Sequence, residues 1–208
     1  MLLAHVAIAF HVTTGTAIAA DGGSPREYIQ QTSDQALAIL KDQSVDAATR
    51  RRRLEDLAGQ RFDFETMSRL TLGRNWNQLS SAQQPEFVQE FKEHLSVTYG
   101  RNIDSYSNEV VEIVGDREEA RGDWTVKTKI VRGGGNADIL VDYRLRRSGD
   151  GWKIIDVTIE GVSLVANFRS QFQDIVSKGG VDRLLVLLQE KNQKGESILP
   201  PKDSGPKG

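Results

Sequence analysis

Residues 124–130 read WTVKTKI and residues 139–145 read ILVDYRL, two runs in which apolar and polar side chains alternate. Such alternation is typical of a β-strand that has one covered face and one wet face. The residues between the runs include GGGN at 133–136, which favours a hairpin turn. Strands joined by so short a connection pair antiparallel. These residues therefore predict the antiparallel sheet at the centre of the fold.

Two further strands extend this hairpin on either side. Val111 and Ile113 begin the alternation, and the turn SGDG at residues 148–151 leads into the last strand. One face of that last strand is expected to carry Lys153, Ile155, Val157 and Ile159. Short turns between successive strands predict an antiparallel meander of about four strands.

Helical patterns lie on both sides of the predicted sheet. Ser24 and Pro25 are typical of an N-cap followed by proline at the first helical position, and Gly73 is placed to end a short helix. We expect helices over residues 25–40, 46–58, 62–72, 81–101, 164–176 and 181–188. Gly179-Gly180 separates the last two. The order helices, strands, helices predicts an α+β fold, with N- and C-terminal helices packed against the sheet.

The composition excludes several classes of function. The chain has 208 residues, with 27 Lys and Arg against 29 Asp and Glu, and its net charge of −2 gives no general reason to bind nucleic acid. It contains no cysteine, which excludes disulfides, thiolate zinc sites and a cysteine nucleophile. Nucleotide-binding loops, metalloprotease motifs and serine-hydrolase motifs are also absent from the sequence. A noncatalytic binding role is therefore favoured.

The N-terminal stretch predicts export. Residues 1–20 contain no Lys, Arg, Asp or Glu, and an apolar run there ends in the small residues of 17–20, AIAA. This pattern predicts a cleaved signal peptide over residues 1–20; a membrane anchor is the alternative. Residues 21–192 are then a single domain. Residues 193–208, which include three prolines, are expected to form a disordered tail.

Few side chains in the predicted domain favour catalysis. Asp156 and Glu160 share one face of the last strand and could act as an acid–base pair, but no nucleophile accompanies them, so a structural role is preferred. Ser163 precedes an apolar helix and is expected to be its N-cap. His94 has polar neighbours and is expected to be a solvated helix residue. We expect no catalytic residue, no metal and no cofactor.

The run DVTIEGVSLVANFRSQF at residues 156–172 resembles the MlaC family of phospholipid carriers. Further matching pieces follow in family order: Phe64, Leu72-Gly73 with Trp76, residues 79–99, Val141 with Tyr143, residues 151–157, and Gly180 with Leu184. The resemblance covers about residues 25–192.

The resemblance implies a soluble periplasmic protein that extracts a phospholipid and holds its acyl chains in an internal apolar cavity. It also implies two partners: an outer-membrane lipoprotein–porin complex and an inner-membrane complex of an MCE-domain protein with an ABC transporter. The role of such a carrier is maintenance of outer-membrane lipid asymmetry. A monomer is the expected state of a shuttle. A related branch of the family implies a hopanoid as the alternative cargo.

The energy of lipid transfer sets the size of such a cavity. A diacyl lipid exposes about 30 methylenes to water, which at about 0.8 kcal/mol each is on the order of 20–25 kcal/mol. A carrier must therefore enclose most of both tails. We expect the lining to consist of Phe91, Leu95, Tyr99, Val126, Ile139, Val141, Tyr143, Val157, Ile159, Leu164, Val165 and Phe168. Arg169 is expected to meet a head-group phosphate or to stabilise the cavity mouth.

Two other interpretations remain open at this point. The same apolar residues pack a dry core if the protein is only an adaptor that bridges membrane complexes through its surface. The consecutive arginines Arg50–Arg53 are usually a solvated face, but they are also suited to an acidic partner or to lipid head groups. An enzyme that uses Asp156 and Glu160, such as a lipid hydrolase, is the third hypothesis.

Overall fold

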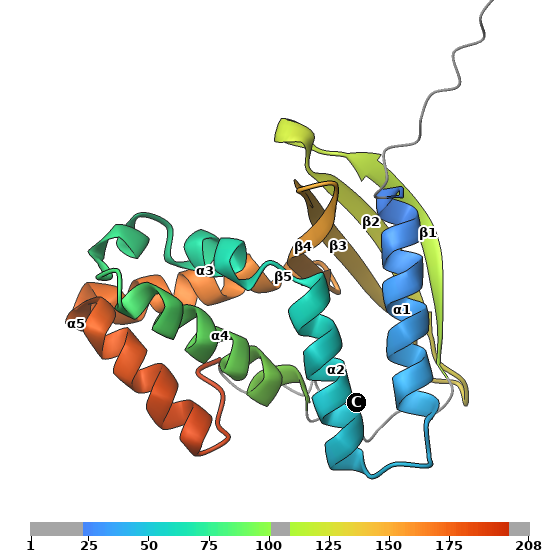
Figure 1. Ribbon diagram of the computed structural model, residues 1–208, viewed down its shortest axis with the longest axis horizontal. Helices are drawn as coiled ribbons and strands as arrows, with labels where there is room; N and C mark the ends of the chain where they lie inside the picture. The colour runs from blue at the N-terminus through green and yellow to red at the C-terminus, as the bar shows by residue number, and fades with distance from the viewer. Residues whose placement is uncertain (1–22, 101–108, 200–208) are drawn as a thin grey trace, which may run out of the picture.

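The computed structural model describes residues 23–100 and 109–199 (Figure 1). The predicted signal peptide and the last nine residues of the predicted tail lie outside these ranges. Five α-helices and one five-stranded sheet make up most of the described chain. The α+β prediction is therefore confirmed.

Four helices precede the sheet, and local capping explains where they begin. They are α1 (Pro25–Lys41), α2 (Ala47–Arg61), α3 (Phe64–Leu72) and α4 (Gln83–Tyr99), with the 3-10 helix η1 (Gly73–Gln78) after α3. Ser24 and Glu27 form a reciprocal capping box at α1, while Asp46 and Asp63 cap α2 and α3. Each cap satisfies an N–H group that has no partner inside its helix.

The sheet is an antiparallel meander in chain order. Its strands are β1 (Val110–Glu118), β2 (Trp124–Val131), β3 (Ile139–Ser148), β4 (Gly151–Ile159) and β5 (Val162–Ser163), and the short 3-10 helix η3 (Ala120–Gly122) joins β1 to β2. We expected about four strands; the fifth has only two residues, too few to show alternation.

A bulge changes the predicted faces of β4. The register shifts by one residue between Arg144 and Leu145, so that Leu145 pairs with Ile154. Ile154, and not Lys153, therefore shares the face of Val157 at this end of the strand. The prediction that Lys153 lies on the same face as Val157 is wrong, because alternation cannot reveal an extra residue in the pairing.

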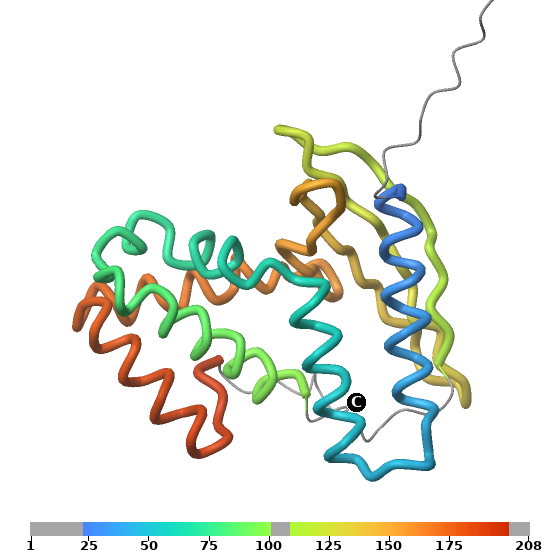
Figure 2. Tube along the Cα trace, in the orientation of Figure 1, coloured from blue at the N-terminus to red at the C-terminus, as the bar shows by residue number. Residues whose placement is uncertain are grey.

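Helix α5 (Leu164–Gln193) turns sharply at Gly180, where φ is 77° and ψ is 177°. Figure 2 shows the chain reversing direction there, so that the second half of α5 lies back along α4. This confirms the predicted separation into two helical segments. Ser163 accepts a hydrogen bond from the N–H of Ala166 and is the predicted N-cap.

The apolar side chains form two clusters. The helical cluster joins α3, η1, α4 and α5, with Phe87, Phe91, Phe168 and Phe172 in mutual ring contact. The sheet cluster joins α1 to one face of the sheet and includes Ile29, Val126, Val141, Leu145, Trp152, Ile154, Val157 and Leu164. Figure 1 shows α1 along the sheet and the bundle of α3, α4 and α5 beside it.

Candidate functional site

The face of the sheet that α1 covers, called here the inner face, is mostly apolar. The antiparallel register places Val126 of β2 opposite Tyr143 of β3, and Tyr143 opposite Val157 of β4, so these side chains share the face. Thr128 is the polar exception, and its hydroxyl donates a hydrogen bond of 2.9 Å to the backbone carbonyl of Val141. The inner face thus offers an apolar surface with its hydroxyl already satisfied.

Burial changes along this inner face. At one end, called the closed end, Leu145 and Ile154 have no exposed surface. At the other, called the open end, the isoleucines Ile130, Ile139 and Ile159 remain half-exposed. Each loses part of the roughly 1.5–3 kcal/mol that full burial of such a side chain provides. The open end is therefore the part of the inner face with apolar surface still available to a ligand.

Helix α1 shows the same change along its length. Ile29 and Ser33 are buried in its N-terminal half, whereas Ala36 and Leu40 are half-exposed in its C-terminal half. Spacings of three and four residues put these four side chains on one face of the helix. Two facing elements are therefore packed less completely at the same end of the molecule.

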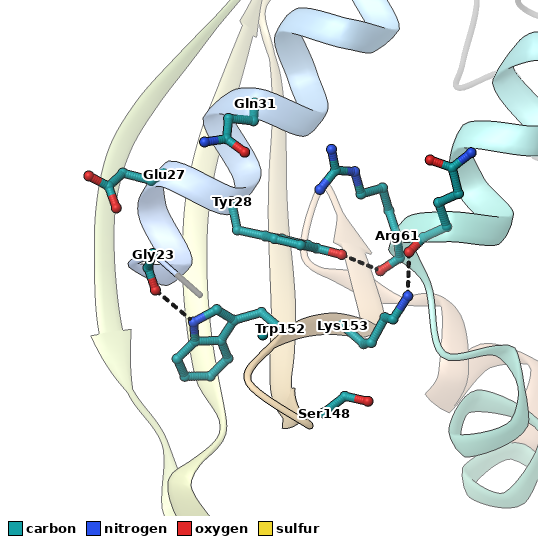
Figure 3. A pocket seen from close by; sticks show the side chains of 10 residues that line it. Gly23, Glu27, Tyr28, Gln31, Arg61, Ser148, Trp152 and Lys153 are labelled. Atoms are coloured by element: carbon teal, nitrogen blue, oxygen red, sulfur yellow. Dashed lines mark hydrogen bonds between the residues drawn. The ribbon is translucent and has the colours of Figure 1, made fainter. Parts of the chain in front are cut away.

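The closed end is held by polar contacts between distant segments. The indole Nε1 of Trp152 donates to the backbone carbonyl of Gly23 at 3.2 Å, and the hydroxyl of Tyr28 donates to the backbone carbonyl of Arg61 at 3.1 Å (Figure 3). The Arg61 guanidinium lies 4.9 Å from the centre of the Tyr28 ring. These contacts fasten the start of α1 to the end of α2 and to the start of β4.

A surface pocket of about 550 Å³ lies among these closed-end residues. Several of its groups are already engaged within the chain: the Lys153 ammonium, for example, donates to the backbone carbonyl of Gln60 (Figure 3). That carbonyl belongs to the last turn of α2, where a cation offsets the negative end of the helix dipole. We interpret the pocket as part of a structural brace, distinct from the predicted lining.

The predicted lining residues divide between the two clusters. Those in or against the helical cluster are Phe91, Leu95, Val165 and Phe168. Those in or against the sheet cluster are Val126, Ile139, Val141, Tyr143, Val157, Ile159 and Leu164. Within the sheet cluster, Ile139 and Ile159 belong to the open end. Which of these residues touch a ligand stays a prediction.

Tyr99 and Phe62 contact both clusters. Tyr99 ends α4 and is half-buried, and burial raises the pKa of its phenol above 10.0. Burial likewise raises the pKa of Tyr143, and a hydrogen bond with Thr128 opposes that rise in part. Both phenols are neutral at pH 7, so they present uncharged surface to the interior.

Arg169 lies apart from the inner face. It is exposed on α5, and its Nη2 is 3.1 Å from the position that a Cβ at Gly73 would occupy. Gly73 ends α3, with φ at 55° and ψ at −126°. The structure therefore brings Arg169 beside α3 and not beside the isoleucines of the open end, and its expected role toward a head group stays a prediction.

The two carboxylates considered for catalysis serve the backbone. Asp156 accepts hydrogen bonds from the N–H groups of Val157 and Val165 and, at 2.6 Å, from the Ser163 hydroxyl. Glu160 accepts a hydrogen bond from the backbone N–H of Leu140. Both therefore fix the connection from β4 to α5 and to β3, which is the structural role that the sequence favoured.

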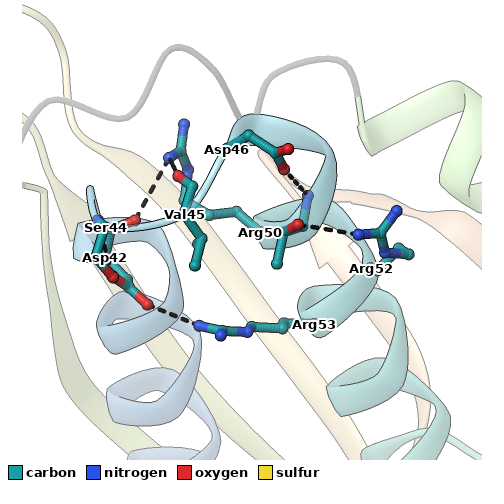
Figure 4. A network of polar contacts seen from close by, with 8 residues as sticks. Asp42, Ser44, Val45, Asp46, Arg50, Arg52 and Arg53 are labelled. Carbon is teal, nitrogen blue, oxygen red and sulfur yellow. Dashed lines mark hydrogen bonds and ion pairs between the residues drawn. The ribbon is translucent and has the colours of Figure 1, made fainter.

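The arginine run folds back onto the α1–α2 turn. Arg50 donates to the backbone carbonyl of Val45 at 2.7 Å, and Arg53 pairs with the Asp42 carboxylate at 2.7 Å (Figure 4). Arg52 donates to the hydroxyl of Thr49. At least Arg50 and Arg53 thus have a structural use in joining α1 to α2.

His94 is buried, with no exposed surface, so the expectation of a solvated residue is wrong. Its ring lies against Phe168, with centroids 5.8 Å apart. The polar neighbours of His94 along the sequence concealed its burial. The helical spacing indicates it, because Phe87, Phe91 and His94 follow each other at intervals of four and three residues and share the buried face of α4.

Sequence reasoning also missed part of the open end. Ile130 and the apolar side chains of the second half of α1, among them Ala36 and Leu40, were not among the expected lining residues. The sequence did contain a signal for Ile130. It lies four residues after Val126, so the alternation puts both on the same face of β2, and it pairs with Ile139 in the register. The helical period of α1 likewise marked its apolar face.

Within the described ranges, no helix is long and apolar enough to cross a membrane. In the same part of the chain, His, Asp and Glu side chains do not gather in threes in a way that could hold a metal ion.

A family model described as MlaC protein matches residues 30–190. A relative from Haemophilus influenzae, the intermembrane phospholipid transport system binding protein MlaC, is 27% identical over 123 residues, or 57% of each chain. The chain thus spans little more than half the length of that relative. The toluene tolerance protein ttg2D of Pseudomonas putida is 24% identical over 167 residues, or 76% of each chain.

A solved structure has a similar fold. It is that of a phospholipid-binding protein from Ralstonia solanacearum in complex with a phospholipid. The TM-score is 0.75 and the sequence identity 26%, and the match covers 83% of this chain and 99% of the other.

Proposed function

The chain belongs to the MlaC family, and from this premise we propose that it is a periplasmic carrier that binds a phospholipid by its acyl chains. Its relatives support the cargo, since one is named for intermembrane phospholipid transport and another was solved with a phospholipid bound. The tails would occupy the space between the inner face and α1, and they would enter from the open end.

The half-exposed isoleucines of the open end are the observation that carries this proposal. Ile130, Ile139 and Ile159 lie on the inner face, which α1 covers along β1 and β2. Acyl chains placed there would complete the burial of apolar groups on both sides, with a gain that grows by about 0.8 kcal/mol for each methylene removed from water. The closed end, which polar contacts hold together, would set the depth of the site.

The family supports a shuttle role for the carrier. In this proposal the protein exchanges lipid with an outer-membrane lipoprotein–porin complex and with an inner-membrane complex of an MCE-domain protein and an ABC transporter. ATP hydrolysis would belong to that inner-membrane complex, since the sequence has no nucleotide-binding motif. The result would be maintenance of outer-membrane lipid asymmetry by a noncatalytic monomer.

Native mass spectrometry of the purified protein, followed by lipid extraction, tests the cargo. We expect a mass increment equal to one or two phospholipids that denaturation releases. A hopanoid mass would contradict the phospholipid assignment. A protein that carries no lipid and takes none from phospholipid vesicles would contradict the carrier function itself.

A matched pair of variants tests the location. Ile139 and Leu140 are adjacent on β3, but Ile139 lies on the inner face and Leu140 is 52% exposed on the other. Ile139→Glu should abolish lipid recovery, because a carboxylate among acyl chains is strongly disfavoured. Leu140→Glu, which places the new charge beside Lys129 of β2, should leave recovery unchanged. Equal lipid content in the two variants would contradict the site.

Val141 and Val157 are less suitable positions for this test. Both are buried in the sheet cluster, so a glutamate there would destabilise the fold whether or not lipid binds. The half-exposed isoleucines separate binding from stability more cleanly.

A further inference from the structure

His94 is the central member of a chain of hydrogen bonds that links α4, α5 and the residues that follow α5. The backbone N–H of Ile198 donates to Nε2 of His94 at 3.0 Å. On the other side of the ring, Nδ1 of His94 and Oδ1 of Asn192 are 2.8 Å apart. Asn192 in turn donates through Nδ2 to the backbone carbonyl of Glu90 at 2.9 Å and to the Glu90 carboxylate at 2.8 Å.

These partners determine the protonation state of the ring. A backbone N–H can only donate, so Nε2 must be an unprotonated acceptor. Because the Asn192 amide group directs its Nδ2 to Glu90, its Oδ1 faces the histidine and accepts from Nδ1–H. The contacts on both sides therefore fit one state alone: neutral imidazole with its proton on Nδ1.

The segment bound by this histidine, residues 194–199, packs along α4 and α5. We expected these residues to belong to a disordered tail, but the side chains of Ile198 and Leu199 lie against the helical cluster. The hydroxyls of Ser197 and Thr98 are 3.0 Å apart, and Lys191 pairs with Glu196 at 2.5 Å. Thr98 precedes Tyr99, so the segment contacts the turn of α4 that carries Tyr99 to the sheet cluster.

We propose that His94 is an acid-sensitive latch that holds residues 194–199 against α4 and thereby braces the last turn of α4, including Tyr99. Protonation places a hydrogen on Nε2, opposite the N–H of Ile198, so that two donors face each other. The hydrogen bond is lost and the new positive charge is buried. Release of the segment lets water reach the ring and relieves both penalties.

The charged groups around His94 favour release of the segment when the ring is protonated. Lys191 of α5 opposes a positive ring, although its own charge is paired with Glu196 of the segment. The Glu90 carboxylate on α4 reaches His94 only through Asn192. Burial lowers the pKa of His94 below 6.5; the hydrogen bond with Asn192 opposes this shift and Lys191 adds to it.

The sign of the pH dependence follows from that shift. The released state has a hydrated ring with a pKa near 6.5, and the latched state has a lower pKa. The latch is therefore fully stable above pH 6.5 and weakens as the pH falls from 6.5 to the latched pKa. Each unit between the two pKa values weakens it about tenfold.

NMR on the full chain tests the latch without any lipid, so its outcome is independent of the proposed function. At pH 8 the nitrogen shifts of His94, assigned with the His94→Gln variant, should report the Nδ1–H tautomer. The ring should titrate below 6.5. An Nε2–H tautomer, or titration at or above 6.5, would overturn the proposal.

Hydrogen exchange, corrected for its intrinsic pH dependence, measures release. The N–H of Gly100, the C-cap of α4, donates to the carbonyl of Ser96 and reports on the last turn of that helix. Between pH 8 and pH 5 the amides of Ile198 and Gly100 should lose about tenfold in protection for each unit of the pKa shift. Protection in the β2–β3 pairing should not change, which separates release from global unfolding. Constant protection at Ile198 while His94 titrates would overturn the latch.

Two variants complete the test. His94→Gln has no group that titrates in this range, so Ile198 protection should become independent of pH, whether the segment stays bound or not. Ser197→Ala removes the Thr98 contact and the hydrogen bond that the Ser197 hydroxyl accepts from the N–H of Leu199, but it leaves the contacts of His94 in place and should keep the pH dependence. Persistence of the pH dependence in His94→Gln would overturn the assignment to His94.

Discussion

The carboxylate of Asp156 accepts a hydrogen bond of 2.6 Å from the hydroxyl of Ser163, so one side chain joins β4 to the N-cap of α5. The same carboxylate accepts the N–H of Val165 in the first turn of α5. This joint sets the angle at which α5 leaves the sheet, and through it the position of Phe168 against α4.

Replacement of Asp156 tests the structural role of this carboxylate. Asp156→Ala should destabilise the protein by about 1–2 kcal/mol, because it removes the acceptor for the N–H of Val165 in the first turn of α5 and a negative charge near that helix N-terminus. Urea unfolding measures this directly. Asp156→Asn keeps part of the hydrogen bonding and should cost less. Unchanged stability in both variants would contradict the structural role of Asp156 and would favour the catalytic hypothesis instead.

A large side chain at Ala36 should block lipid binding. Ala36 lies on the half-exposed part of the inner side of α1, so Ala36→Trp would fill space that acyl chains need. Its cost to stability should be below the roughly 1–3 kcal/mol of overpacking a closed core. Lipid extracted per mole of protein is the measurement, and circular dichroism reports the fold.

Ala38 supplies the control for this change. It is two residues away on the same helix but is exposed, so Ala38→Trp should leave both lipid content and stability close to those of the parent chain. If both tryptophan variants keep their lipid, the tails do not lie along α1.

Gly73 should resist substitution for two separable reasons. Its φ of 55° with ψ of −126° is accessible to glycine, and a Cβ there would also meet the Arg169 guanidinium at 3.1 Å. Gly73→Ala should therefore lower stability by about 1–3 kcal/mol. In an Arg169→Ala background the close approach is gone but the backbone strain remains, so most of the loss should persist. A full recovery would show that the side chain contact, and not the backbone, sets the cost.

Asp123 should contribute to stability in a pH-dependent manner. It is buried between Arg146, at 2.7 Å, and Arg144, at 3.2 Å. Burial by itself would raise the pKa of Asp123, but the hydrogen bonds and charges of the two arginines outweigh it and hold the pKa below 3.8. A depressed carboxyl pKa stabilises the folded state above pH 3.8, and this contribution is lost as the pH falls through the folded value.

Comparison with Asp123→Asn checks that sign. At pH 7 the variant should be less stable by about 1–3 kcal/mol, because the three charge-assisted hydrogen bonds from Arg144 and Arg146 are weakened. The difference from the parent chain should shrink as the pH falls below 3.8. A stability difference that stays constant down to pH 2 would mean that Asp123 titrates alike in the folded and unfolded states.

Local sequence signals predicted the elements well, and long-range contacts explain what they missed. Ser24, Gly73, Ser163 and Gly180 act through their own backbone neighbourhood, so each marked a helix boundary correctly. The hydrogen-bond partners of His94 are instead Asn192 and Ile198, about a hundred residues away, and nothing near His94 in sequence indicates them.

The candidate site shows the same division. Alternation assigned Ile139 and Val141 to one face, as the register confirms. It could not indicate that Val141 is buried while Ile139 is half-exposed, because that difference depends on what α1, and Tyr99 at the end of α4, cover on the sheet. Arg50 and Arg53 similarly serve a turn whose geometry appears only once α1 and α2 are side by side.

The strand order β1-β2-β3-β4-β5 has a consequence for folding. Each strand pairs with the one made just before it, so the sheet can grow by successive hairpins with little loop-closure entropy at each step. The helical cluster has no such route. Phe87 and Phe91 of α4 must wait for Phe168 and Phe172, which come after the whole sheet in the chain. Until α5 arrives, the two α4 rings lack these partners, and that interval is when the unfinished chain is most exposed to aggregation.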